Sequence, residues 1–278
     1  MAAQSGKLAM AAQQRVRAEL FRRLHVSGAP VVLFNIWDVG SARAVAASGA
    51  PALATSSSAL SASHGLDDGQ VLPLAALLET AARIATTDGV APLPLSVDFE
   101  GAYAVSPEEV GVNVSRLIAT GAVGLNFEDQ RVGVGPSWTN GKGMYTVPEQ
   151  VARIEACRAA ADAAGVPLVV NVRTDLLLKE PDASKHALLF DETIARANAY
   201  ADAGADCLFI PALVNDLDLV AKICSASPLP INVMYLGPSS GPGVAALAAA
   251  GVARISHGSM PYRAAHEWLG DQARKALL

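Results

Sequence analysis

Two carboxylates end one apolar run of the chain. The segment LPLSVDFEGAY, residues 93–103, has the pattern of a buried strand and carries Asp98 and Glu100 at its end, with no lysine or arginine beside them. Residues two apart share one face of a strand, so both side chains are expected to point the same way. Like charges held that close either raise their pKa values or bind a cation.

Further acids follow two other apolar runs. Asp68 lies in the loop after the second run, and Glu128 ends the fourth. Oxygen ligands without histidine or cysteine favour a hard ion, so we predict that Asp98, Asp68, Glu100 and Glu128 form a Mg2+ site. The alternative is that each acid caps the helix that follows its strand.

Groups suited to an anionic ligand come from other runs. Arg173 ends the fifth run and is predicted to bind a substrate carboxylate or phosphonate, the alternative being a structural ion pair with Asp175 or another acid. The serines at 56–58 could offer hydroxyl and backbone N–H groups, and Asn232 a neutral hydrogen-bonding group. A serine hydrolase is not predicted, because the chain has no G-x-S-x-G segment.

The elements that must position these residues alternate along the chain. Helical stretches separate eight apolar runs, at 31–38, 51–57, 93–100, 123–130, 167–175, 207–213, 230–236 and 253–259. Continuous apolar strands are typical of a parallel sheet covered by helices, and eight strand–helix units predict an α/β fold of the (β/α)8 TIM-barrel type. A doubly wound sheet is the rival, but no G-x-G-x-x-G follows a strand. In such a barrel the active site lies at the carboxyl ends of the strands.

One domain over residues 1–278 is predicted, with a helical lead-in at 1–25 and a helical tail at 255–278. Either of these two segments could pack on the barrel or on a partner subunit. The net charge is −5 and basic residues are not clustered, which argues against a nucleic-acid or anionic membrane surface. No apolar stretch reaches the roughly 18 to 20 residues that span a bilayer. A cytoplasmic enzyme with a small-molecule substrate is therefore predicted.

Seven segments, in order, resemble the isocitrate lyase and phosphoenolpyruvate mutase superfamily. They are NIWDVGSAR (35–43), ATSSSALSASHGLDDG (54–69), SVDFEGAY (96–103), GLNFEDQ (124–130), NVRTD (171–175), IPAL (210–213) and INV (231–233). The resemblance implies a (β/α)8 barrel that assembles as a homodimer or a homotetramer, a dimer of dimers with swapped C-terminal helices. It also implies a Mg2+-dependent lyase-type enzyme that acts on a small 2-oxo acid or dicarboxylate through an enolate, as a carbon–carbon lyase or an oxaloacetate decarboxylase or hydrolase.

The resemblance also implies roles for single residues. Asp98 would be the principal metal-side aspartate, while Asp68, Glu100 and Glu128 would act through metal-bound waters. Arg173 would bind the substrate, so that Asp68, Glu128 and Arg173 form the catalytic set. The remaining matches would contact substrate: Ser56, Ser57 and Ser58 at its 2-oxo acid carboxylate, Asn232 at a second carboxylate, and Trp37 as an aromatic lining of the pocket.

The loop 131–145 departs from the lyases. Where they carry a cysteine and a histidine, this loop reads RVGVGPSWTNGKGMY and has neither. The proton donor is left open among Tyr145, Lys142 and a metal-bound water, and Asn140 with Lys142 could instead hold a phosphoryl group. Two other functions therefore stay open: a binding protein for pyruvate, oxaloacetate or 2-oxoglutarate with little lyase activity, and a phosphonopyruvate P–C bond enzyme.

Overall fold

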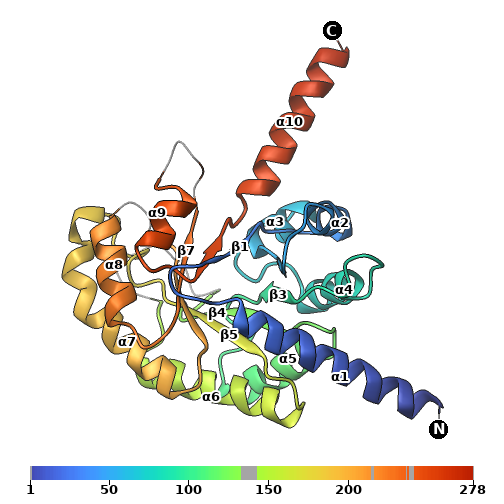
Figure 1. The fold of residues 1–278 in the computed structure, drawn as a ribbon, viewed down its shortest axis with the longest axis horizontal. Coiled ribbons are helices and arrows are strands. Elements are labelled where there is room, and N and C mark those ends of the chain that lie inside the picture. The colour runs from blue at the N-terminus through green and yellow to red at the C-terminus, as the bar shows by residue number, and fades with distance from the viewer. Residues whose placement is uncertain (1, 133–142, 214–215, 236, 238–240, 278) are drawn as a thin grey trace.

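Eight parallel strands form one sheet in the computed structural model (Figure 1). The structure describes residues 2–132, 143–213, 216–235, 237 and 241–277, with side chains from residue 11 onward. The strands are β1 (Val31–Leu33), β2 (Leu53–Ala54), β3 (Leu95–Asp98), β4 (Gly124–Glu128), β5 (Val169–Arg173), β6 (Cys207–Ile210), β7 (Ile231–Met234) and β8 (Arg254–Ser256). Each predicted run contains one of these strands, so the eight-strand prediction is confirmed, although every strand is shorter than its run.

The sheet curls into a barrel. Its strand order is β1-β8-β7-β6-β5-β4-β3-β2, and an isolated parallel bridge between Ile36 and Thr55 joins the two edge strands. The predicted (β/α)8 fold is therefore confirmed. Nearly every strand residue is buried, as expected for a sheet covered on its outer face by helices.

The helices of the described chain are α1 (Ala2–Arg23), α2 (Val39–Ala47), α3 (Ser57–Ser63), α4 (Leu74–Ala85), α5 (Pro107–Ile118), α6 (Val147–Ala163), the 3-10 helix η1 (Ala183–Leu189), α7 (Phe190–Asp202), α8 (Leu217–Ala226), α9 (Val244–Ala249) and α10 (Met260–Leu277). Side-chain oxygens cap several of their N-termini, including Asp38 for α2, Ser106 for α5 and Thr146 for α6. Each of these caps satisfies a free backbone N–H in the first turn of its helix.

Helix α1 closes the amino-terminal end of the barrel. Its Phe21 is fully buried, and a Cβ added at Gly124, the first residue of β4, would lie 2.7 Å from the Phe21 ring. Gln14 donates to the carbonyls of Ile118 and Ala122 at 2.8 and 2.9 Å. The last turns of the predicted lead-in therefore pack into the core of the barrel.

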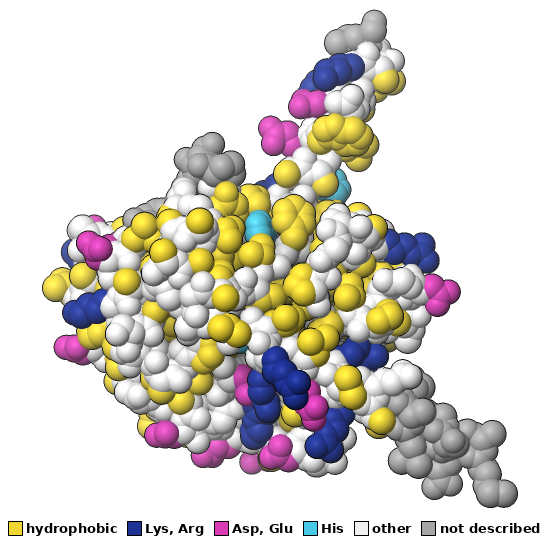
Figure 2. Space-filling model, viewed as in Figure 1, with side chains coloured by type: hydrophobic (Ala, Val, Ile, Leu, Met, Phe, Trp, Pro, Cys, Tyr) yellow, Lys and Arg dark blue, Asp and Glu magenta, His cyan; other side chains and the backbone are white. Residues whose placement is uncertain are grey.

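Helix α10 stands away from the barrel (Figure 1). Trp268 and Leu269 on it are 63% and 57% exposed, and Figure 2 shows hydrophobic side chains on the projecting part. The helix begins at Met260, four residues after β8 ends at Ser256. The predicted tail boundary at residue 255 therefore falls inside this last strand. No helix within the described ranges is long and apolar enough to cross a membrane.

Candidate active site

A cavity of about 260 Å3 opens at the carboxyl ends of the strands. Its lining includes six of the predicted site residues, namely Ser56, Ser57, Ser58, Asp68, Asp98 and Arg173. Residues that the sequence did not single out complete its lining, among them Asn35, Asn126, Phe209, Pro211, Met234, Ser256, Gly258 and Ser259. The position of this cavity is the one that a (β/α)8 barrel predicts.

A smaller cavity of about 130 Å3 adjoins the first. Ser57, Asp68 and Arg173 line both, and Glu100 and Glu128 line the smaller one. The four predicted metal-side acids therefore face two neighbouring cavities, with Asp98 in the larger, two glutamates in the smaller, and Asp68 between them.

Asp98 ends β3 and is held by its neighbours on both sides. Its Oδ2 accepts a hydrogen bond from the Ser57 backbone N–H at 2.9 Å, and its Oδ1 lies 3.4 Å from Asn126 Nδ2. Its own N–H donates to Thr55 Oγ1 at 2.9 Å. These contacts fix both oxygens of the carboxylate at the floor of the larger cavity.

Glu100 lies in the turn that follows β3, with only 4% of its surface exposed. Its carboxylate accepts from the Gln70 N–H at 2.7 Å and from the Tyr103 hydroxyl at 3.4 Å. Burial, and then the charges of Asp68 and Asp98, raise the pKa of Glu100 to about 8. The Asp68 side chain lies at the more open rim, and crowding by protein atoms together with Asp98 raises its pKa as well. Such shifts are typical of carboxylates that share a site or await a cation.

The turn that carries Glu100 has an unusual backbone. Glu100, Ala102 and Tyr103 have φ values of 50°, 60° and 53°, in the left-handed region that non-glycine residues rarely adopt, and the contacting Gln70 has 61°. Arg153 holds the turn by donating to the Gly101 carbonyl at 2.7 Å. Strain retained by surrounding contacts is characteristic of functional sites.

The guanidinium of Arg173 is bound by two acids. Its Nε and Nη2 donate to the two oxygens of Asp175 at 2.6 and 3.0 Å, and its Nη1 lies 3.0 Å from Glu128 Oε2. Burial lowers the pKa of Arg173, but the charges of Asp175 and Glu128 outweigh it and hold that pKa well above its ordinary value. Burial raises the pKa of Glu128 against the opposing charge of Arg173. The structural ion pair that the sequence left as an alternative is therefore present, in a side chain that also lines both cavities.

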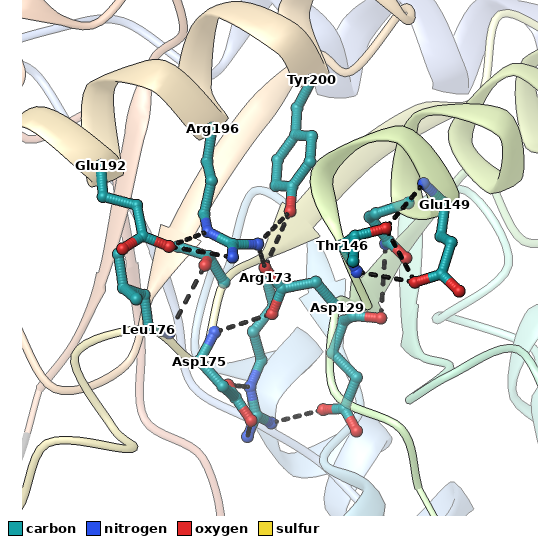
Figure 3. Close-up of polar contacts among 12 residues, drawn as sticks. Asp129, Thr146, Glu149, Arg173, Asp175, Leu176, Glu192, Arg196 and Tyr200 are labelled. Atoms are coloured by element: carbon teal, nitrogen blue, oxygen red, sulfur yellow. Dashed lines mark hydrogen bonds and ion pairs between the residues drawn. The ribbon is translucent and has the colours of Figure 1, made fainter. Parts of the chain in front are cut away.

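A buried hydrogen-bond network holds Asp175, the partner of Arg173, in place (Figure 3). The Asp129 carboxylate accepts from the Asp175 N–H at 3.0 Å, from Arg196 at 3.1 Å and from the Tyr200 hydroxyl at 2.8 Å. Burial raises the pKa of Asp129, and the charge of Arg196 opposes that rise. Helix α7, which carries Arg196 and Tyr200, thus fixes the strand ends that present Arg173.

None of the four metal-side acids caps the helix after its strand. Ser106 caps α5 and Thr146 caps α6, so the capping alternative does not hold for Glu100 or Glu128. Asp98 does accept a hydrogen bond from Ser57 in the first turn of α3. However, α3 follows β2 and not β3, and its N-cap residue is Ser56.

Two predicted residues lie elsewhere. Trp37 is not among the described residues that line the two cavities. Its ring contacts Tyr262 of α10 edge to face, at a centroid distance of 5.2 Å. Asn232 is fully buried and exchanges hydrogen bonds with Ser256 at 3.2 Å, so it meets the larger cavity only through that serine. These two substrate contacts remain predictions, and the geometry does not support the one for Trp37.

The loop after β4 is described only at its ends. Asn140 and Lys142 lie outside the described residues. Tyr145 is buried, with the guanidinium groups of Arg131 and Arg153 at 4.3 and 3.8 Å from its ring centroid. Its N–H donates to the Asp129 carbonyl at 2.8 Å, which anchors this end of the loop to β4.

The donors present suit a metal that takes few protein ligands. Among the residues that the structure describes, no group of three or more histidine, cysteine, aspartate or glutamate side chains is close enough to hold an ion. Mg2+ is commonly bound by one or two carboxylates together with water and substrate, and Asp98 and Asp68 face the same cavity. Burial and the neighbouring carboxylates raise the pKa values of Asp68 and Glu100, and a bound divalent ion would lower them. The acids therefore fit Mg2+ but not a site built from protein ligands alone.

Comparison with known proteins identifies relatives along most of the chain. A family model described as phosphoenolpyruvate phosphomutase matches residues 21–277. An uncharacterized protein of Mycobacterium tuberculosis is 34% identical over 246 residues, which cover 88% of this chain and 83% of that protein. The 2-methylisocitrate lyase of Escherichia coli is 36% identical over 182 residues, which cover 63% of this chain and 55% of the lyase.

Solved structures share the fold. A protein from Burkholderia cenocepacia, provisionally named a phosphonomutase, superimposes with a TM-score of 0.86 at 42% identity, covering 95% of this chain and 99% of that one. A phosphonopyruvate hydrolase in complex with oxalate and Mg2+ has a TM-score of 0.74 at 24% identity, covering 94% of this chain and 86% of the hydrolase. At that identity the hydrolase is evidence for the fold alone.

Proposed function

Because the chain belongs to the phosphoenolpyruvate mutase and isocitrate lyase superfamily, we propose that it is a Mg2+-dependent enzyme that acts on a small 2-oxo acid through an enolate. The observation that carries this proposal is the larger cavity, where Asp68 and Asp98 face the serines at 56–58 and Arg173. Its volume of about 260 Å3 suits a substrate of only a few carbon atoms. Breaking or forming a carbon–carbon bond next to the oxo group is the reaction we favour.

The chain's own residues would bind and orient the substrate. Arg173 uses three of its five N–H groups in its contacts with Asp175 and Glu128. The other two, together with the serine hydroxyls, would hold the substrate carboxylate. Glu128 and Asp175 fix that guanidinium before substrate arrives, so little ordering is needed on binding. Asp68 lies between the two cavities, where it could move a proton at the reacting carbon.

Asp98 would hold the metal, with Asp68, Glu100 and Glu128 reaching it through water. Bound Mg2+ would stabilise the negative charge that develops on the enolate oxygen. Asp98 is suited to this position because its two oxygens are already oriented by Ser57 and Asn126.

The test is Mg2+-dependent release of pyruvate from oxaloacetate and from a panel of 2-hydroxy and 2-oxo dicarboxylates. We expect turnover by the native chain and its loss in Asp98→Ala. Asp67→Ala is the matched control, because Asp67 is an exposed neighbour of Asp68 that lines neither cavity, and it should keep full activity. Calorimetry would follow binding of oxalate; tight binding without turnover on any compound would favour a 2-oxo acid binding protein instead.

A P–C bond enzyme is the second candidate. It is favoured by the 42% identity to the Burkholderia protein provisionally named a phosphonomutase, which the chain covers almost completely. Arg173 would then hold a phosphonate oxygen in place of a carboxylate. Release of phosphate from phosphonopyruvate, or its conversion to phosphoenolpyruvate, would select this candidate over carbon–carbon cleavage.

A further inference from the structure

Below the floor of the larger cavity, an arginine crosses the barrel interior. Arg254 comes from β8 and is fully buried, and its Nη2 donates to Asn126 Oδ1 on β4 at 3.0 Å. β4 and β8 are opposite one another in the closed barrel, with three strands between them on either side. Phe21 of α1 lies on the other side of the guanidinium, 5.6 Å from it. Arg254 therefore lies between helix α1, which closes the amino-terminal end of the barrel, and the floor of the larger cavity.

Within the described part of the chain, this charge has no acid to pair with. No carboxylate forms an ion pair with Arg254, and its Nε and Nη1 have no hydrogen-bond partner there. Burial lowers the pKa of Arg254 to about 10, so it remains charged at neutral pH. A buried guanidinium with one bond is costly to keep, and an apolar side chain of similar size would pack there more cheaply. Packing alone therefore does not account for an arginine at this position.

The direction of the hydrogen bonds above Arg254 is set from both ends, because Arg254 can only donate and the Asp98 carboxylate can only accept. Asn126 and Asn171 are amides, each able to donate or accept, and Asn171 Nδ2 also donates to Asn126 Oδ1, at 2.7 Å. The Asn171 Oδ1 has no described partner, so Asn171 does not set this direction. Arginine has donors only, so it requires an oxygen of Asn126 to face it. The Nδ2 of Asn126 must then face Asp98, where it lies 3.4 Å from Oδ1.

We propose that Arg254 is a positioning residue that acts through Asn126 to fix the orientation of the Asp98 carboxylate. The Ser57 N–H holds one oxygen of Asp98 and Asn126 holds the other, so the pair of contacts sets the rotation of the carboxylate. Arg254 lines neither cavity, so it acts without touching substrate. The consequence for metal binding rests on the proposed function, whereas the orientation of Asp98 does not.

The first experiment is a crystal structure of metal-free Arg254→Met, compared with the native chain in the same crystal form. We expect the Asn126 side chain to turn and the Asp98 carboxylate to rotate away from its contact with Asn126. Arg254→Lys should show the same change, because the shorter side chain carries one point charge and does not reach across the barrel in the same geometry. An unchanged Asn126–Asp98 contact in both variants would overturn the proposal, whatever the enzyme's reaction.

The second experiment measures Mn2+ affinity by calorimetry. The direction in which the affinity changes distinguishes an effect of the position of Arg254 from an effect of its charge. If Arg254 acts only through its charge, Arg254→Met should bind Mn2+ more tightly, because a nearby positive charge is gone, and Arg254→Lys should match the native chain. If it positions Asp98, both variants should bind Mn2+ about tenfold or more weakly, the loss typical when a partner of a metal ligand is removed. Tighter or unchanged binding in both would contradict the proposal. Absence of Mn2+ binding by the native chain would instead count against the proposed function, leaving the crystal structures to decide the role of Arg254.

Arg158→Met is the matched control. Arg158 donates to the carbonyls of Gly204 and Leu168 and pairs with Asp206, outside the barrel interior. We expect this variant to lose thermal stability while its Mn2+ affinity stays native. Arg254→Met, which removes an unpaired buried charge, should keep or raise its melting temperature. A fall in both melting temperature and Mn2+ affinity in Arg254→Met, with the Asn126–Asp98 contact retained, would assign Arg254 a structural role only.

Discussion

At the residue scale, the pKa of Glu100 makes the stability of the metal-free chain depend on pH. The pKa is about 8 in the folded chain and near 4.5 in the unfolded one, so the folded state binds the extra proton between those values. Stability therefore falls as pH rises from about 5 to about 8, by roughly 4 kcal/mol for a shift of this size. Urea denaturation without metal should show this slope, and Glu100→Gln should flatten it. Saturating Mg2+ should also flatten it, and a slope unchanged by Glu100→Gln would contradict the assignment.

Asp175 acts on substrate through Arg173. It accepts two of the hydrogen bonds of that guanidinium, so Asp175→Asn leaves Arg173 with one firm partner, Glu128. We expect about a tenfold weaker binding of oxalate, measured by calorimetry, with the fold retained in circular dichroism. Asp191→Asn, an exposed acid at the start of α7, is the control and should bind oxalate as the native chain does. Native oxalate affinity in Asp175→Asn would show that Arg173 is held well enough by Glu128 alone.

At the element scale, the turn after β3 is predicted to store backbone strain. Ala102 is fully buried with φ at 60°, and a left-handed conformation costs an L-residue about 1 to 2 kcal/mol. Ala102→Gly relieves that cost, whereas Ala161→Gly, at a fully buried helical position in α6, adds about 1 kcal/mol of helix propensity. Both changes remove one buried methyl group. Chemical denaturation should therefore find Ala102→Gly less destabilising than Ala161→Gly by at least about 1 kcal/mol, and equal losses would mean that the turn is not strained.

The elements were more predictable from sequence than the contacts of their polar side chains. Apolar runs mark the eight strands because a parallel sheet buries both faces, and the acids at their ends follow from the barrel geometry. Asn126 could have been found, since it lies two residues before Glu128 and shares its face of the strand. Trp37 could not be placed, because it follows the last bridge of the first strand and its neighbour Tyr262 is far away in the sequence.

The strained turn and the buried arginine left weaker signals. Nothing in the residue types Glu100, Ala102 and Tyr103 indicates a left-handed backbone, because contacts from Gln70 and Arg153 impose it. Arg254 is a charged residue in an apolar run, which does mark it as unusual. Its partner Asn126 lies 128 residues earlier, however, and only the closed barrel brings the two together.

At the scale of the whole molecule, α10 is predicted to bind a second copy of the chain, as the expected homodimer or homotetramer requires. Trp268 and Leu269 lie largely exposed on a helix that stands clear of its own barrel (Figures 1 and 2). Large apolar side chains gathered on a projecting helix are typical of an interface. Light scattering after size-exclusion chromatography should find an oligomer for the native chain and a smaller species for Trp268→Glu with Leu269→Glu.

Assembly through α10 should also affect the cavity. Gly258 and Ser259 line it immediately before α10 begins, and Tyr262 in the first turn of the helix contacts Trp37 in the loop between β1 and α2. A partner that holds α10 in place would therefore steady one side of the cavity rim, so the double variant should bind oxalate more weakly as it dissociates. Leu188→Glu is the control, because Leu188 is 81% exposed on η1 and its replacement should change neither mass nor affinity. A native chain that is monomeric, or a double variant that keeps the native mass, would contradict an interface on α10; dissociation with native oxalate affinity would keep the interface and separate it from the site.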